Sequence, residues 1–228
     1  MKILYLIPAR KGSKGLPDKN VKVLGNKPLI AYTIDFALKN IKEGDELCIS
    51  TNDDKVLEIV TDLGINVPFR RPEELATDEA NSYDVIMHAV KHYENIEKFF
   101  DVVLLLQPTS PLRSQDDFDN LIKEYSDSID MIVSVKMVKD NPYFNLFEED
   151  NLGFLEKSKK GNFQRRQDVP SVFAFNGSMY LMNVDSLKKM AIGNFKKIRK
   201  VVMPDERSVD IDTFADWNLA EFYLKNKI

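Results

Sequence analysis

The stretch Ile3–Asn20, with the sequence ILYLIPARKGSKGLPDKN, decides the fold of this chain. Its first residues are apolar and mostly branched or aromatic, which predicts a short buried strand. The strand leads into a loop that holds one arginine, three lysines and two glycines. Glycines let a backbone approach a ligand closely, and cationic side chains neutralise phosphate charge. The stretch therefore indicates a strand followed by an anion-binding loop, with a solvated basic turn as the alternative.

Strands and helices alternate along the chain as far as residue 136. We therefore expect an α/β fold with a mainly parallel sheet that is covered by helices on both faces. In such a sheet ligands bind outside the carboxyl ends of the strands, where the loops at 10–20 and 107–113 both fall. The predicted strands are 3–7, 46–50, 101–106 and 131–135, and the predicted helices are 28–38, 53–63, 82–93 and one that begins at Ser114 with a capping box to Asp117.

The pattern changes in residues 137–172, which contain no strongly helical segment. Residues 141–147 and 153–155 are typical of short strands. A lone hairpin is marginal in water and its aromatic residues need burial, so we interpret this segment as a small β arm that packs on a second subunit. A single domain, 1–228, with the arm at 137–172 within it, fits this pattern best. The chain returns to the core through predicted strands near 178–182 and 200–203, a helix near 184–190 and a final helix that carries Trp217.

The composition argues against several classes of protein. A net charge of −4 over 228 residues disfavours nucleic acid as the partner, because binding a polyanion needs a basic face. The single Cys48 cannot form an intrachain disulfide. No apolar run has membrane-spanning length, and the chain starts directly with a strand, so we expect no membrane association and a cytoplasmic location. The basic loop is a local exception in a mildly acidic protein, which suits a small anionic ligand.

The basic loop differs from the two common phosphate-binding motifs. The Rossmann fingerprint needs three glycines in G-x-G-x-x-G, but only Gly12 and Gly15 are present here. The P-loop pattern G-x-x-x-x-G-K-[ST] is absent as well. We therefore expect a phosphate loop of a third type, which relies on the side chains of Arg10, Lys14 and Lys19.

A pair of carboxylates stands near the end of the chain, in the segment Ser208–Asp212. In extended backbone alternate side chains share a face, so Asp210 and Asp212 point one way while Val209 and Ile211 point to the core. Two carboxylates on one face fit a Mg²⁺ ion, whose remaining ligands would be substrate phosphate oxygens and water. The alternative is that Asp212 is only the N-cap of the last helix and Asp210 is solvated.

Two further polar segments are candidates for ligand contact. Arg71–Ala76 is followed by small polar residues that include Ser82; it could contact a base and its phosphate, or it could be a surface loop. Arg165 and Arg166 could form a fork for a carboxylate or a phosphate, or they could be a solvated face.

Taken together, six segments resemble the cytidylyltransferases that activate sialic acid and related nine-carbon acid sugars, the CMP-N-acetylneuraminate synthetases. The segments follow the family's order and its approximate spacing over essentially the whole chain, which makes the match specific. They are 8–20, 71–76, 106–113, 166–170, 176–180 and 208–212.

The resemblance implies both a fold and a reaction. The fold would be a three-layer αβα sandwich of the Rossmann-like nucleotidyltransferase type, with the β arm joining two subunits in a homodimer. The C2 hydroxyl of N-acetylneuraminic acid would attack the α-phosphorus of CTP, and pyrophosphate would leave with the assistance of Mg²⁺, giving CMP-sialic acid. Such reactions depend mostly on positioning and charge neutralisation.

The resemblance also implies roles for single residues. Arg10 and Lys19 would stabilise charge on the transferring and leaving phosphates, and Asp210 with Asp212 would bind the metal, which makes these four the catalytic residues. Arg166 would reach the sugar site of the other subunit from the arm. The residues implied in CTP binding are Arg10, Ser13, Lys14, Lys19, Asn20, Arg71 and Ser82. Those implied in sugar binding are Gln107, Arg166, Tyr180 and Phe195.

One departure from the family pattern bears on the substrate. Phe144 stands where a bacterial sialic acid enzyme has lysine. We therefore keep CMP-legionaminic and CMP-pseudaminic acid synthesis as alternatives, because those enzymes share most of the motifs. A CMP-Kdo synthetase is less favoured, since its first loop resembles S-x-R-L-P-G-K-P. The alternative from another class is a catalytically silent nucleotide-sugar binding protein, against which the presence of Lys19 and both aspartates argues.

Overall fold

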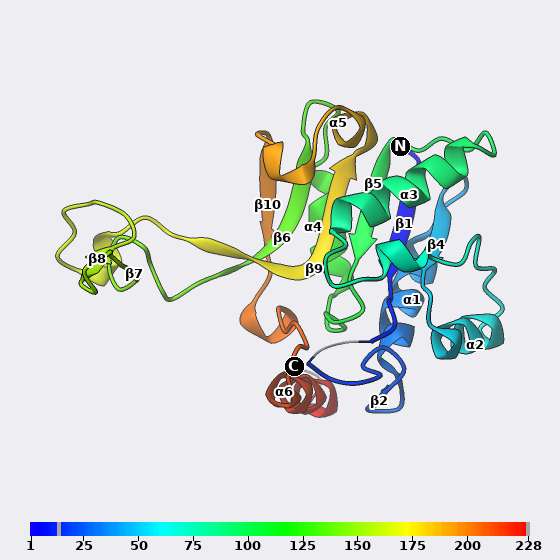
Figure 1. The fold of residues 1–228 in the computed structure, drawn as a ribbon, viewed down its shortest axis with the longest axis horizontal. Coiled ribbons are helices and arrows are strands. Elements are labelled where there is room, and N and C mark those ends of the chain that lie inside the picture. The colour runs from blue at the N-terminus through cyan, green and yellow to red at the C-terminus, as the bar shows by residue number, and fades with distance from the viewer. Residues whose placement is uncertain (13–14, 227–228) are drawn as a thin grey trace.

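The computed structural model describes residues 1–12 and 15–226, and within these ranges six strands form one sheet in the order β10-β6-β9-β5-β1-β4 (Figure 1). All neighbouring pairs are parallel except those of β9, which runs antiparallel between β5 and β6. The mainly parallel sheet expected from the alternation of elements is therefore confirmed. The strands are β1 Ile3–Pro8, β4 Glu46–Ser50, β5 Val102–Leu106, β6 Met131–Met137, β9 Phe173–Asn183 and β10 Ile198–Val202.

Helices cover both faces of the sheet, because successive strand side chains point to opposite sides. Ile3, Tyr5 and Ile7 of β1 lie in one buried apolar cluster, whereas Leu4 and Leu6 lie in a second. Residues of α1, α2 and α4 pack in the first cluster, and residues of α3 and α5 pack in the second. This two-sided burial explains why β1 and β5 are apolar runs without alternation. The helices are α1 Leu29–Asn40, α2 Asp54–Asp62, α3 Ser82–Glu94, α4 Gln115–Lys123, α5 Val184–Lys189 and α6 Phe214–Asn226.

Several local signals in the sequence are confirmed. The Ser114 hydroxyl accepts from the Asp117 N–H, and the Asp117 carboxylate accepts from the Ser114 N–H, which completes the expected capping box of α4. The Asp53 side chain caps α2, and Gly64 follows that helix with a φ of 73°. Cys48 is fully buried in the second cluster, as expected for a core residue. Among the helices in the described ranges, none is long and apolar enough to cross a membrane.

The segment between β6 and β9 extends away from the body and ends in a hairpin of β7 Phe147–Glu149 and β8 Leu155–Lys157 (Figure 1). The strand prediction for 141–147 is wrong for most of its length, because residues 142–145 form a turn. The physical reason is turn chemistry: the Asn141 side chain accepts from the Tyr143 N–H at 3.0 Å and competes with strand pairing.

Short elements complete the described chain. They are β2 Val23–Leu24, β3 Lys27–Pro28 and four turns of 3₁₀-helix, η1 Glu73–Leu75, η2 Arg166–Asp168, η3 Ile192–Asn194 and η4 Asp205–Arg207.

Candidate active site

A crevice of two adjoining hollows lies at the carboxyl ends of β1 and β5, where the sequence pattern predicts ligand-binding loops. Pro8 and Arg10 line both hollows and so join them. The larger hollow, of about 300 Å³, is also lined by Gly15, Lys19, Asn20, Gln107, Thr109 and Asp212. The smaller hollow, of about 200 Å³, is also lined by Arg71, Leu75, Thr77, Ala80, Ser82 and Val85.

Lys19 joins the opening loop to the far end of the chain. Its side chain is almost entirely buried, and its ammonium donates to the Ile211 carbonyl at 2.5 Å and to Asp212 Oδ1 at 2.9 Å. A small apolar cluster beneath the loop, which includes Leu16, Ile211 and Trp217, holds the two segments together. Figure 1 shows the same proximity, with α6 lying beside the blue loop that follows β1. A cation and a carboxylate separated by nearly the whole sequence therefore meet in one crevice.

Gly15 has a steric role in this contact. A Cβ placed there would lie 2.0 Å from the Asp212 carbonyl oxygen, closer than any side chain allows. Only glycine lets the loop pass so near the backbone of the C-terminal segment. Ser13 and Lys14, which the resemblance assigns to CTP binding, lie outside the described residues.

The segment 208–212 has the expected alternation. Val209 and Ile211 are buried, and the Ile211 N–H donates to the Thr109 carbonyl at 2.8 Å, which fixes the segment to the turn after β5. The alternative that Asp212 caps the last helix is wrong. Thr213 takes that place, because its hydroxyl accepts from the Asp216 N–H at 3.3 Å and donates to the Asp216 carboxylate at 2.7 Å. The Asp212 side chain, which is 75% exposed, is thus free to face the crevice.

Asp210 has an unusual environment. Its Oδ1 atom is buried and has no hydrogen-bond partner among the described residues. Burial raises the pKa of this carboxyl, and the nearby charge of Asp212 raises it further, whereas a hydrogen bond from the Thr109 side chain and the charge of Lys19 lower it. Gly177, with a φ of 75°, makes room for the carboxylate, since a Cβ there would lie 2.7 Å from Asp210 Oδ2.

The two aspartates fit a divalent cation. A buried carboxylate oxygen without a donor, beside a second carboxylate, is an arrangement that a bound cation would stabilise. No group of three or more His, Cys, Asp or Glu side chains in the described ranges is arranged to hold a metal by itself. Phosphate oxygens and water would have to supply the remaining ligands, as is usual for Mg²⁺.

The smaller hollow combines a fixed cation with a helix start. The Arg71 guanidinium donates to Ser50 Oγ at 2.9 Å and to the Ser50 carbonyl at 2.6 Å, so its position is determined by β4. Burial lowers the pKa of Arg71 to about 10, which leaves it cationic at neutral pH. Ser82 lies beside it in the first turn of α3. Arg10, which lines both hollows, pairs with Asp78 at 2.6 Å.

The sequence-predicted sugar contacts are only partly brought together. Gln107 lines the larger hollow, and Tyr180 lies in β9, between Leu105 of β5 and Val133 of β6. Burial raises the pKa of Tyr180, and the charge of Asp210 adds to this effect. The hydroxyl of Tyr180 is therefore neutral in the ordinary pH range.

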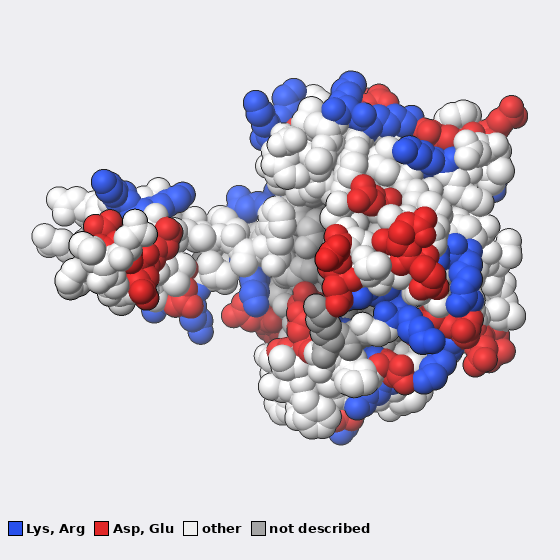
Figure 2. Space-filling view, viewed as in Figure 1, with Lys and Arg blue, Asp and Glu red and all other residues white. Residues whose placement is uncertain are grey.

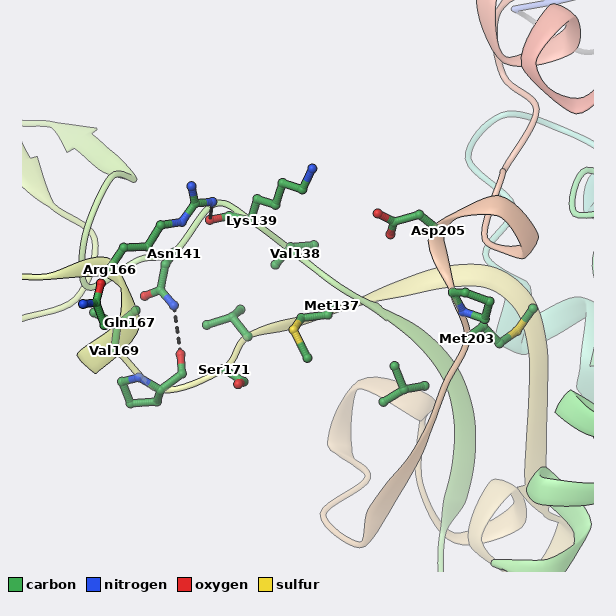
Figure 3. A pocket seen from close by; sticks show the side chains of 14 residues that line it. Met137, Val138, Lys139, Asn141, Arg166, Gln167, Val169, Ser171, Met203 and Asp205 are labelled. Carbon is green, nitrogen blue, oxygen red and sulfur yellow. Dashed lines mark hydrogen bonds between the residues drawn. The ribbon is translucent and has the colours of Figure 1, made fainter. Parts of the chain in front are cut away.

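Arg166 and Phe195 lie elsewhere. Arg166 is part of the arm, where it donates to the Lys139 carbonyl at 2.5 Å and lines a separate hollow of about 650 Å³ at the root of the arm (Figure 3). Phe195 follows η3 and is buried in the second apolar cluster, at the end of the sheet where β5 begins. The structure does not bring Phe195 to the crevice, because it is a core residue at the opposite end of the strands.

Charges on the visible face are mixed. Figure 2 shows basic side chains interspersed with acidic ones over the body, and both signs again at the tip of the arm. This distribution suits local pairing with small anions more than a continuous contact with a polyanion.

Sequence reasoning assigned no role to two residues that shape the site. Gly177 occurs in a strand-like run, and a glycine inside a strand often marks a close approach by another group, which was the available signal. Arg113 ends the turn after β5, and its guanidinium is buried beneath Gln107. No sequence signal distinguishes such a buried arginine from a surface one.

Comparisons with known proteins agree with this geometry. A family model described as cytidylyltransferase matches residues 4–222. The N-acylneuraminate cytidylyltransferase of Streptococcus agalactiae serotype V is 34% identical over 221 residues, which cover 95% of this chain and 52% of that protein, so the chain spans about half of its length. The CMP-N,N'-diacetyllegionaminic acid synthase of Legionella pneumophila is 30% identical over 222 residues, which cover 97% of this chain and 95% of that protein.

A solved structure points to the same architecture. The structure of a CMP:2-keto-3-deoxy-manno-octonic acid synthetase complexed with CTP has a TM-score of 0.73 to this chain and covers 100% of both chains, at 17% identity. At this identity the likeness concerns the fold alone. The family match, by contrast, includes all segments that form the crevice.

Proposed function

This chain belongs to the cytidylyltransferase family, and from that premise we propose that it transfers CMP from CTP to the C2 hydroxyl of N-acetylneuraminic acid, giving CMP-sialic acid and pyrophosphate. One observation carries the proposal. The buried Lys19 and Asp212 of the C-terminal segment meet in a crevice that adjoins a second hollow, which holds the fixed cation of Arg71.

The two hollows suggest how CTP lies. The cytidine would occupy the smaller hollow beside Arg71 and Ser82, and the triphosphate would pass Arg10 into the larger hollow beside Lys19 and Asn20. For the phosphate to reach Arg10, the carboxylate of Asp78 would have to give way to it. Arg10 and Lys19 along this path would neutralise phosphate charge, which is the main requirement for nucleotidyl transfer.

The transfer itself is a displacement at phosphorus. The C2 oxygen of the sugar bonds to the α-phosphorus while the bond from that phosphorus to the bridging oxygen breaks. Pyrophosphate leaves with the bridging oxygen, and the hydroxyl proton passes to water. Lys19, whose side chain is almost entirely buried, would hold its ammonium against the negative charge that grows on these phosphates.

We propose Mg²⁺ as the cofactor, held by Asp210 and Asp212. The ion would supply charge neutralisation to the triphosphate and to the leaving pyrophosphate. The unpartnered Oδ1 atom of Asp210 supports this assignment, because an ionised carboxylate oxygen that is buried without a donor is costly unless a cation accompanies it.

The acid sugar would bind beside Gln107 and Tyr180, and we propose that a homodimer completes its site. Arg166 lies on the arm and lines the hollow at the root of the arm (Figure 3), and it is not among the residues that line the crevice of its own chain. The arm also exposes large apolar side chains, with Phe154 and Leu155 each 67% exposed. Burial of these side chains against a second copy would place Arg166 of the partner subunit near the carboxylate of the sugar.

A diacetylated legionaminic acid is the second candidate acceptor. The chain matches 95% of the length of the Legionella pneumophila synthase, and Phe144 on the arm is a departure from the sialic acid pattern. An apolar side chain there would suit an acceptor with an extra acyl or deoxy group. Pseudaminic acid has the same features and is included in the test.

A substrate panel tests the proposal. Purified protein, CTP and Mg²⁺ would be mixed with N-acetylneuraminic, legionaminic, pseudaminic or Kdo acid, and pyrophosphate release would be recorded. We expect the wild-type protein to have its highest kcat/KM with N-acetylneuraminic acid. The matched variant Asp212→Asn should release no pyrophosphate with any of the acids. A higher kcat/KM with legionaminic or pseudaminic acid would show that this acid, and not N-acetylneuraminic acid, is the preferred acceptor. Binding of CTP without turnover of any acid would identify a silent nucleotide-binding protein.

A further inference from the structure

Arg113 is a buried cation that the proposed reaction does not use. It lies at the end of the turn that joins β5 to α4, with its side chain turned inward and only 7% exposed. Its guanidinium lies over the ring of Phe36, with Cζ 5.4 Å from the ring centroid. Burial lowers the pKa of Arg113 to about 9, which still leaves it cationic at pH 7.

All hydrogen-bond acceptors recorded for Arg113 are neutral. Nη2 donates to the Gln107 carbonyl at 2.7 Å and to the Ser178 carbonyl at 3.2 Å, Nε donates to Ser178 Oγ at 3.2 Å, and Nη1 donates to Thr33 Oγ1 at 2.9 Å. No ion pair involves Arg113 within the described ranges. A buried charge without an ion-pair partner is costly, and apolar residues of similar size usually serve stability as well or better. Stability alone therefore does not account for an arginine at this position.

Two of the three residues that accept hydrogen bonds from Arg113 lie beside the site, whereas the third, Thr33, belongs to α1. Gln107 is the first residue after β5 and lines the larger hollow, and Ser178 follows Gly177, the residue that makes room for Asp210. The planar guanidinium thus fixes the backbone on the two sides of the acceptor half of the crevice, in a geometry that a single ammonium could not reproduce. The negative charge of Asp210, on the site side of Arg113, raises the pKa of the guanidinium and so favours its cationic form.

We propose that Arg113 is a positioning residue for the acid-sugar acceptor. By holding the Gln107 carbonyl inward, it fixes the direction in which the Gln107 side chain faces the hollow. The cytidine half of the crevice, around Arg71 and Ser82, receives no hydrogen bond from Arg113 among the described residues. The inference rests on the proposed function, and it requires that loss of Arg113 weakens acceptor binding selectively.

The test compares the Michaelis constants of the two substrates. Arg113→Met keeps the length of the side chain without its charge, and Arg113→Lys keeps the charge without the fork. We expect Arg113→Met to raise KM for the acid sugar about tenfold or more and to leave KM for CTP unchanged. A tenfold rise corresponds to about 1.4 kcal/mol, which is about the contribution of one hydrogen bond from a charged group, here the bond that holds the Gln107 carbonyl. Arg113→Lys should raise the sugar KM by a smaller factor. If Arg113→Met does not fold, Arg113→Lys decides by the same comparison.

Tyr5→Phe is the matched control for stability. It removes a buried hydrogen bond, from the Tyr5 hydroxyl to the Asn40 carbonyl at 3.1 Å, in the first apolar cluster. We expect Tyr5→Phe to lower Tm and to leave KM for CTP and KM for the acid sugar unchanged. An unchanged sugar KM in the Arg113 variants, or an equal rise in both KM values, would overturn the positioning role. Wild-type protein that turns over no acid sugar would overturn the proposed function itself, and the role of Arg113 with it.

Discussion

Gly15→Ala is the sharpest perturbation of the contact between the opening loop and the C-terminal segment. The added Cβ would lie 2.0 Å from the Asp212 carbonyl oxygen and 3.1 Å from its carbonyl carbon. Both are backbone atoms, so no side-chain rotation relieves the overlap. The loop or the segment must therefore move by about 1 Å, which separates Lys19 from Asp212, the pair now 2.9 Å apart.

The size of the effect follows from this displacement. A misplacement of about 1 Å in a catalytic group costs about 100-fold in rate, or about 2.7 kcal/mol of transition-state stabilisation. Over-packing also lowers the free energy of unfolding, by about 1–3 kcal/mol. We expect kcat/KM for pyrophosphate release to fall about 100-fold in a protein that remains folded by circular dichroism.

Gly193→Ala provides the control. A Cβ at Gly193 meets no described atom within 4 Å, and its φ is not in the left-handed region, so we expect unchanged activity and Tm. A Gly15→Ala protein with the kcat/KM of the wild type would refute the reasoning, because the loop and Asp212 could then separate without effect on the reaction.

Three further outcomes are expected. Asp210→Asn should abolish turnover with Mg²⁺ present, yet raise Tm at pH 7 in protein kept free of divalent cations. Burial raises the pKa of Asp210, so the ionised form costs stability above the ordinary carboxyl pKa of about 4, and the gain in Tm measured by thermal denaturation should disappear below that pH. An unchanged or lower Tm at pH 7 would contradict this. Arg166→Ala should raise KM for the acid sugar far more than KM for CTP, and equal effects in steady-state kinetics would remove its assignment to the sugar. Deletion of residues 143–165 should give a monomer by light scattering, and a persistent dimer would exclude the arm as the interface.

The core of the fold could be predicted because its signals are local. The apolar runs of β1 and β5 and the Ser114 capping box depend on residues that are neighbours in sequence, so their patterns survive without tertiary information. The turn at 142–145 was missed because the Asn141 side chain competes with strand pairing, which an apolar pattern does not reveal.

The site could be predicted only in part, since its contacts are long-range. The pairing of Lys19 with Asp212 spans most of the sequence and was accessible only through the resemblance, not through spacing. The cap at Thr213 could not be chosen over Asp212, because both residue types cap helices. Phe195 was misplaced for a related reason: an aromatic residue looks the same in sequence whether it lines a sugar pocket or fills the core.

Direct detection of the product tests the central claim most closely. The chain would be incubated with CTP, N-acetylneuraminic acid and Mg²⁺, and ³¹P NMR would follow the α-phosphorus of CTP. We expect this phosphorus to appear in a phosphodiester between CMP and the sugar, with one pyrophosphate formed for each product molecule. Release of free CMP, or an unchanged CTP signal with every acid sugar of the panel, would contradict the assignment of the crevice as a site of cytidylyl transfer to a sugar.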